Sequence, residues 1–247
     1  MANWNDPRPT GTGFGASPSL SGASSRGEVF DAGLRRHMLS IYNYMASGVL
    51  LSGVVALGAA SSGLTASLVG SPLMWLVMLS PLAFVMFMSF GANKFSTTAL
   101  QGMFWGFAVA MGLSLSTIFL VYTGTSIAVT FFATAGAFAG LSLFGYTTKK
   151  SLSGMGSFLI MGVFGILLAS LINLFLQSSG LAWAISFLGV LIFAGLTAYD
   201  TQRLKEQYAY VAGTDFAGKA VVLGALSLYL DFINMFQFLL QFMGDRR

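Results

Sequence analysis

Long apolar stretches dominate the chain, and charged residues interrupt them at only a few places. Residues 37–93, 95–148 and 151–199 contain no Asp, Glu, Lys or Arg. Each stretch is long enough for two helices of about 20 residues, the length that crosses a hydrocarbon core about 30 Å thick, plus a connecting turn. Residues 220–243 add one more apolar segment. The pattern therefore predicts seven membrane-spanning helices.

Turn residues divide the three long stretches near their middles. Gly, Ser, Thr and Pro gather at 61–72, 122–126 and 177–180. A transmembrane barrel would require segments of about ten residues with alternating polarity, whereas these stretches are continuously apolar. We therefore expect an all-α membrane protein, a seven-transmembrane helix bundle. The expected spans are 40–61, 72–92, 100–121, 127–146, 155–176, 182–203 and 220–243.

The composition supports this class and argues against an enzyme. Hydrophobic residues make up 55% of the chain and charged residues 8%, against about 25% charged residues in soluble domains. The absence of cysteine excludes thiolate metal sites, disulfides and cysteine nucleophiles. His37 is the single histidine and follows two arginines at a span end, so no zinc motif or Ser–His–Asp set is present. We expect no enzymatic activity and no resident cofactor.

The beginning of the chain differs from the rest. Residues 1–34 are rich in Gly, Ser, Pro and Thr and contain no apolar run. This composition predicts a disordered cytoplasmic tail with a short amphipathic piece before the membrane. Residues 35–247 then form the transmembrane domain.

Lys and Arg predict the orientation in the membrane. They follow every second span, and the alternate turns carry none, which by the positive-inside rule places the N-terminus in the cytoplasm. The terminal Arg246 and Arg247 then lie outside, unless the last segment re-enters the membrane and returns. Basic residues stand singly or in pairs at span ends, so nucleic-acid binding is not indicated. These basic residues are Arg35, Arg36, Lys94, Lys149, Lys150, Arg203, Lys205 and Lys219.

Two aspartates are the candidate functional residues. Asp231 lies about 18 Å from the nearer charged end of the last span, at 1.5 Å per residue. Asp200 lies near the end of the sixth span. Both positions are equally far from the turn that contains Gly213 and Gly218, so the two carboxylates would reach a similar depth on neighbouring helices. A carboxylate pair is the expected arrangement.

Such a pair has a definite chemistry. Two ionised carboxylates in contact repel each other strongly at low dielectric, so the pair favours sharing one proton. After deprotonation it offers concentrated negative charge to a hard cation such as Ca²⁺. A fixed Ca²⁺ cage is not indicated, because Ca²⁺ takes six to eight oxygen ligands. We therefore expect transient passage of Ca²⁺ at Asp200 and Asp231.

A polar stripe supports the pair. Gly224, Ser227, Asp231 and Asn234 follow one another at three- and four-residue spacing, which places them on one helical face. Intramembrane acids nearly always face the bundle or water, and the rest of this helix is apolar, so we expect the last helix to be central. Two alternatives stay open: Asp200 pairs with Arg203 one turn later, or Asp231 is a structural hydrogen-bonding group.

Two Gly-x-x-x-Gly patterns predict close helix contacts. The third expected span carries Gly102 and Gly106, and the fourth carries Gly136 and Gly140. Packing within the bundle is the first interpretation, and dimerisation is the second.

The stretches GLTAYDTQRLKEQY (195–208) and GALSLYLDFINMF (224–236) resemble the Bax inhibitor-1 family, also called the transmembrane Bax inhibitor motif family, especially its bacterial inner-membrane members. The resemblance covers roughly residues 35–247. It implies a last helix wrapped by the other six and a pH-sensitive Ca²⁺ leak sensed by Asp200 and Asp231. It also implies a basic latch, for which Lys94 is the candidate here.

The resemblance also implies partners. Some bacterial members associate with a membrane-anchored ATP-dependent protease, and family members are tied to suppression of stress and cell death. Our leading hypothesis is a Ca²⁺ leak gated by protonation of the aspartate pair, in a monomer of the bacterial inner membrane. The alternatives are a non-conducting interaction protein that modulates such a protease, and a proton-coupled transporter.

Overall fold

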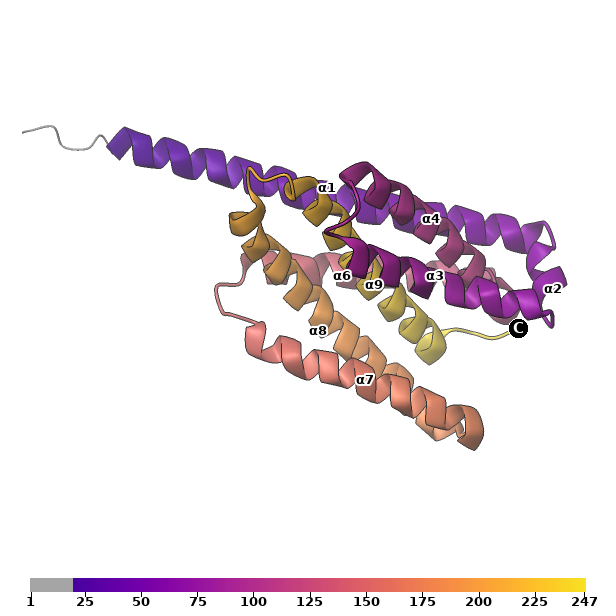
Figure 1. Cartoon of the computed structure of the whole chain (residues 1–247). Helices are drawn as coiled ribbons and strands as arrows, with labels where there is room; N and C mark the ends of the chain where they lie inside the picture. The colour runs from indigo at the N-terminus through magenta and orange to yellow at the C-terminus, as the bar shows by residue number, and fades with distance from the viewer. Residues whose placement is uncertain (1–19) are drawn as a thin grey trace, which may run out of the picture.

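The computed structural model describes residues 20–247, which are almost entirely helical (Figure 1). Residues 1–19, most of the expected tail, lie outside the described residues, and residues 20–34 are the start of the first helix. The helices are α1 (Leu20–Ser61), α2 (Leu64–Leu68), α3 (Pro72–Gly91), α4 (Thr97–Leu115), α5 (Ile118–Val121), α6 (Gly124–Thr147), α7 (Ser153–Leu176), α8 (Ser179–Val211) and α9 (Ala217–Met243).

Seven segments are long and apolar enough to cross a membrane, which confirms the expected number. Each overlaps one expected span, and α4 with α5 forms the third. The apolar part of α1 and the whole of α8 each contain 33 residues, or about 50 Å at 1.5 Å per residue, more than the hydrocarbon core requires. Both helices therefore extend beyond the bilayer core.

Short polar residues begin several of these helices. Ser96 Oγ, Thr123 Oγ1 and Ser178 Oγ each accept a hydrogen bond from a backbone N–H of the following turn. Such caps satisfy N–H groups that have no partner within the helix. The turn residues that divided the apolar stretches in the sequence thus lie directly before α3, α6 and α8.

The last helix, α9, is the most buried of the seven spans. It packs against α8, α1, α6, α4 and α3, and α8 is its most extensive partner. The expectation that all six other spans wrap it is not confirmed, because α7 packs against α8 at the edge of the bundle (Figure 1). The helix α8 therefore lies between α7, the least buried span, and α9 in the core.

Glycines allow close helix contact, but at positions other than the expected patterns. A Cβ added at Gly145 of α6 would collide with the carbonyl of Ala198 in α8, and one at Gly112 would lie 2.7 Å from the Ser52 carbonyl oxygen. Open space surrounds Gly102, Gly136 and Gly140, and Gly106 faces a Phe84 ring that a Cβ would approach to 3.0 Å. The prediction of close contacts within the bundle is therefore wrong at three of these four glycines, because the pattern does not say which face meets a neighbouring helix. Dimerisation through these glycines stays a prediction.

The C-terminus is attached to the turn before α6. Thr123 N–H donates to the Asp245 carbonyl at 3.1 Å, Arg247 N–H donates to the Val121 carbonyl at 2.9 Å, and Asp245 N–H donates to Ser126 Oγ at 2.9 Å. The helix α9 is continuous, and the C-terminus lies beside α2 and α3, away from the projecting start of α1 (Figure 1). A re-entrant last segment is therefore not observed.

Candidate functional site

The two aspartates lie on the neighbouring helices α8 and α9, which the turn around Gly213 joins. Asp200 is 7% exposed and Asp231 is 4% exposed. Asp200 and Arg203 are the ionisable groups whose charges act on Asp231. The structure therefore gathers two carboxylates and one guanidinium at the contact of α8 with α9.

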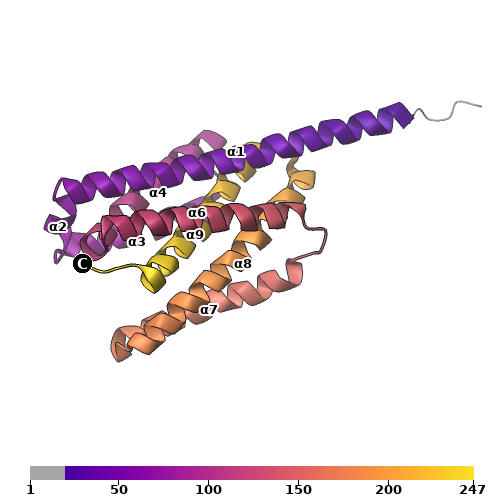
Figure 2. The ribbon, with the colours of Figure 1, turned by 180° about the vertical axis from the view of Figure 1, so that it is seen from behind.

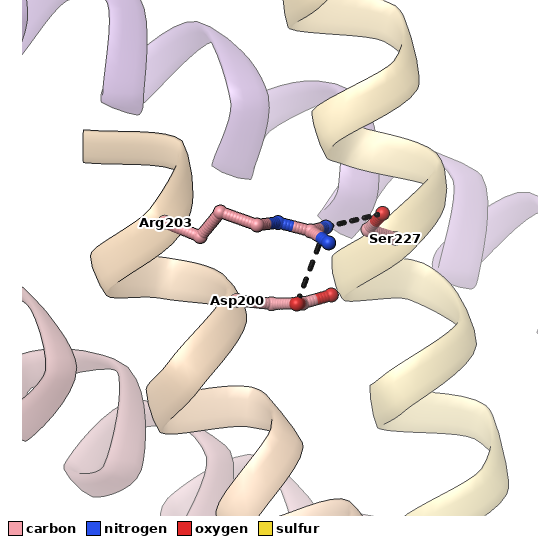
Figure 3. A network of polar contacts seen from close by, with 3 residues as sticks. All are labelled: Asp200, Arg203 and Ser227. Carbon is pink, nitrogen blue, oxygen red and sulfur yellow. Dashed lines mark hydrogen bonds and ion pairs between the residues drawn. The ribbon is translucent and has the colours of Figure 1, made fainter. Parts of the chain in front are cut away.

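Arg203 pairs with Asp200. Its Nη2 lies 3.2 Å from Asp200 Oδ1, the single ion pair between side chains in the part of the chain that the structure describes. The same nitrogen donates to Ser227 Oγ of α9 at 3.4 Å (Figure 3). The ion pair expected as an alternative for Asp200 is thus present, and through Ser227 it also connects the two helices.

Arg203 lies at the border of the protein interior. Its side chain is 46% exposed, whereas that of Asp200 is 10% exposed. Its guanidinium also lies over the Tyr199 ring, 5.7 Å from the centroid. The guanidinium is therefore held by an ion pair, a hydrogen bond and a cation–π contact, and it remains partly exposed.

Asp231 carries an oxygen without a partner. Its Oδ2 is buried and forms no hydrogen bond, and it is the only such side-chain atom found in residues 29–247, whose side chains the structure describes. Leaving a buried polar group unpaired costs about 1–3 kcal/mol, and more for a charged group. A proton or cation that reaches the Asp231 carboxylate therefore lowers this free-energy cost.

The other predicted residues divide into two groups. Ser227 contacts the ion pair, but Asn234 Nδ2 donates to the Leu230 carbonyl of its own helix at 2.7 Å and leaves Asp231 unsupported. Lys94 lies in the turn before α4, next to Ala92, whose carbonyl accepts a hydrogen bond from Lys219 Nζ at 3.2 Å.

The structure does not bring Lys94 to the aspartates. Lys219, in the first turn of α9, contacts the turn that contains Lys94, so Lys94 lies near the start of α9. Lys219 and Asp231 are twelve residues apart on this helix, or about 18 Å. This exceeds the reach of a lysine side chain. The role of Lys94 as a latch stays a prediction.

A crevice next to Arg203, lined by both polar and apolar residues, was not predicted. It has a volume of about 510 Å³ and contains Glu206, Gln207 and Tyr210 of α8 opposite Gly224 and Ser227 of α9. The three- and four-residue spacing of these polar positions after Arg203 is the sequence signal that indicates such a face. The crevice gives water and ions a route to the Arg203 guanidinium.

A fixed metal cage is not formed by the described residues. No group of three or more His, Cys, Asp or Glu side chains occurs among residues 29–247 in a position to hold an ion. Two carboxylates, with Arg203 on one of them, are the available charges. The arrangement suits exchange of a proton or a passing cation better than permanent binding.

Comparison with known proteins finds a family and several bacterial relatives. The model of the family described as inhibitor of apoptosis-promoting Bax1 matches residues 34–247. A protein of Caulobacter vibrioides is 47% identical over 88% of this chain and 91% of its own length. A Rickettsia prowazekii protein is 44% identical over 91% and 95%, and the inner membrane protein YbhL of Escherichia coli is 44% identical over 87% and 94%.

Proposed function

Because this chain belongs to the Bax inhibitor-1 family of membrane proteins, we propose that it is a pH-sensitive leak for Ca²⁺, gated by protonation of Asp200 and Asp231. The observation that carries the proposal is the buried Asp231 carboxylate, which has an unpaired oxygen beside the Asp200–Arg203 ion pair.

The physical basis is the cost of charge in the membrane interior. An unneutralised carboxylate in the bundle is costly, and a proton, a basic side chain or a cation removes that cost. Arg203 neutralises Asp200 in this structure, while Asp231 has no such direct partner. A cation that replaces Arg203 would meet both carboxylates, so movement of Arg203 into the crevice is the step that opens the site.

The crevice is the route by which a cation would reach the aspartates. It joins Arg203 and Ser227 to Glu206 and Gln207, whose side chains offer oxygen ligands to a hard cation. Protonation of the aspartates would remove the attraction for a cation, whereas deprotonation would increase it. The leak is thereby linked to pH through the same two carboxylates.

We also propose the location and orientation. YbhL of Escherichia coli is described as an inner membrane protein, and this chain has seven apolar spans with basic residues at alternate connections. By the positive-inside rule its N-terminus is cytoplasmic. The crevice then opens toward the cytoplasm, since it lies near the connection of α8 to α9.

Reconstitution in liposomes that contain a Ca²⁺-sensitive dye tests the leak. We expect a Ca²⁺ flux that changes across about pH 5 to 8, and we expect Asp231→Asn to weaken or shift the pH dependence because it removes one of the two titrating groups. Asp215→Asn, the same change at an exposed position outside the bundle, should behave as wild type. A flux that ignores pH and is unchanged in Asp231→Asn would contradict the proposal.

A second candidate function rests on the ion pair itself. The Asp200–Arg203–Ser227 contacts tie α8 to α9, which suits a purely structural role in a non-conducting protein that modulates a membrane-anchored ATP-dependent protease. This candidate requires that purified wild type shows no Ca²⁺ flux. Capture of the protease from solubilised membranes should then be equal for wild type and Asp231→Asn.

A further inference from the structure

A deep groove separates α1 from α6. The two helices run alongside each other without packing closely, and α9 crosses behind them (Figure 2). The groove has a volume of about 690 Å³, and Phe232 of α9 lies at its base, directly after Asp231. Its walls are almost entirely apolar, with Met45 and Val49 on α1 and Phe131 and Phe138 on α6. It is open to the surrounding bilayer.

One end of the groove is polar and positively charged. Arg35 and Tyr42 of α1 and Tyr146 of α6 line this end. Lys205 adds a second positive charge there, since its Nζ donates to the Tyr146 carbonyl at 2.7 Å and lies 5.1 Å from the centroid of the ring. None of the described residues that line the groove is acidic. The site is thus amphipathic, with a basic end and an apolar body.

The length of the groove matches one leaflet. From Arg35 to Leu50 the wall on α1 spans fifteen residues, or about 22 Å at 1.5 Å per residue. Half of a hydrocarbon core is about 15 Å, and the headgroup layer adds several ångströms. A lipid with its headgroup at Arg35 therefore places its acyl chains along the apolar wall.

The volume argues against a protein helix as the occupant. A transmembrane helix about 10 Å wide and 30 Å long occupies roughly 2,400 Å³, several times the groove volume of about 690 Å³. Sites for small molecules have volumes of about 300–1,000 Å³. The groove therefore has room for one acyl chain of a membrane lipid but not for a transmembrane helix.

We propose that the groove between α1 and α6 binds one anionic phospholipid of the surrounding leaflet. Its phosphate pairs with the Arg35 guanidinium, which is suited to bidentate phosphate contacts. Its acyl chain lies between the two helices and contacts Phe232. This site is independent of the proposed leak and is not tested by flux.

Native mass spectrometry of the full chain in detergent tests the proposal. Delipidated protein is titrated with anionic phosphatidylglycerol and, separately, with neutral phosphatidylcholine. We expect one tightly bound phosphatidylglycerol, and a loss of about fivefold in affinity in Arg35→Ala, the factor for one basic residue at an anionic surface. Arg36→Ala removes an exposed charge that does not line the groove and should retain wild-type affinity.

A second pair of variants tests the body of the groove. Ala139→Trp fills the α6 wall, and Ala46→Trp fills the α1 wall from the opposite side. Both should abolish the bound phosphatidylglycerol, whereas Ala137→Trp, on an exposed face of α6 outside the groove, should not. Folding of every variant is checked by size-exclusion chromatography and circular dichroism.

Two results would overturn the site. The first is equal binding of phosphatidylglycerol and phosphatidylcholine, with Arg35→Ala no weaker than Arg36→Ala, which would indicate bulk lipid contact only. The second is retention of the bound lipid by the folded variants Ala46→Trp and Ala139→Trp.

Discussion

Tyr229 illustrates how single polar atoms organise the membrane core. Its hydroxyl lies 2.6 Å from Ser52 Oγ, which lies 2.6 Å from the Ala108 carbonyl. Ser52 has one hydroxyl proton, and when it donates to Ala108 the Tyr229 hydroxyl must donate to Ser52. These bonds join α9, α1 and α4 two residues before Asp231. The backbone near the carboxylate is therefore tied to α1 and α4.

We expect Ser52 and Tyr229 to be energetically coupled. In a double-mutant cycle of Ser52→Ala and Tyr229→Phe, the coupling free energy should be about 0.6–1.7 kcal/mol, the range for hydrogen bonds between membrane helices. Unfolding in mixed micelles measures it. Tyr210→Phe, at a ring that is 83% exposed, should change the free energy of unfolding little. Simple additivity of the two single variants would show that the hydroxyls are not coupled.

The carboxylates were predictable from sequence, but their contacts were not. An acidic residue in or beside a long apolar stretch is easy to recognise, so Asp231 and Asp200 can be identified as candidate functional residues from the sequence alone. Position on a helical face does not fix the side-chain rotamer, and Asn234 turns back to its own backbone. The unpaired Oδ2 of Asp231 depends on those rotamers and has no sequence signature.

At the scale of helices, glycine decides where two backbones meet. Gly145 in α6 lies against the Ala198 carbonyl in α8, whereas Gly140 of the same helix faces open space. The close approach holds α8 against α6 at Ala198, two residues before Asp200. The position of the candidate site therefore depends on Gly145 having no side chain.

The two glycines predict opposite effects of alanine. Gly145→Ala should destabilise the protein by about 1–3 kcal/mol, because the new methyl group collides with backbone that cannot rotate away. Gly140→Ala should leave stability unchanged or raise it by up to about 1 kcal/mol, as expected for an exposed helix position. The free energy of unfolding in mixed micelles distinguishes them. Equal effects of the two substitutions would contradict the contact.

The helices themselves were largely predictable, since a continuous apolar run in lipid leaves the backbone only helical pairing. The partners of each helix were not. The apolar pattern of α7 does not reveal that it packs against α8, and nothing in the α1 sequence reveals a groove beside α6. These features depend on crossing geometry between helices that are distant in sequence.

At the scale of the whole molecule, the two ends of the bundle differ. The connection of α6 to α7 carries Lys149 and Lys150, and the connection of α8 to α9 lies at the same end. At the other end the C-terminal residues pair with the turn before α6, where Arg246 also lies over the Tyr122 ring. This contact fixes the C-terminus despite its two arginines.

The cysteine-free chain allows a direct test of orientation. We expect Arg247→Cys to react with a membrane-impermeant maleimide in cells with a permeable outer membrane, because seven spans place the C-terminus on the side opposite to the N-terminus, which we propose to be cytoplasmic. Lys149→Cys, an exposed position at the opposite end, should react only after the inner membrane is opened. The reverse labelling would show that the N-terminus is outside.

The burial of α9 has a consequence for biosynthesis. A ribosome delivers spans in order, so the most buried helix of this protein is the last to enter the membrane. Until then, side chains of α1, α4, α6 and α8 that face α9 lack their partner, and Arg203 lacks Ser227. The pairs α1 with α4, α6 with α8 and α7 with α8 can form earlier, but the core around α9 closes only after this last span has been made, so a chain truncated before α9 exposes that core.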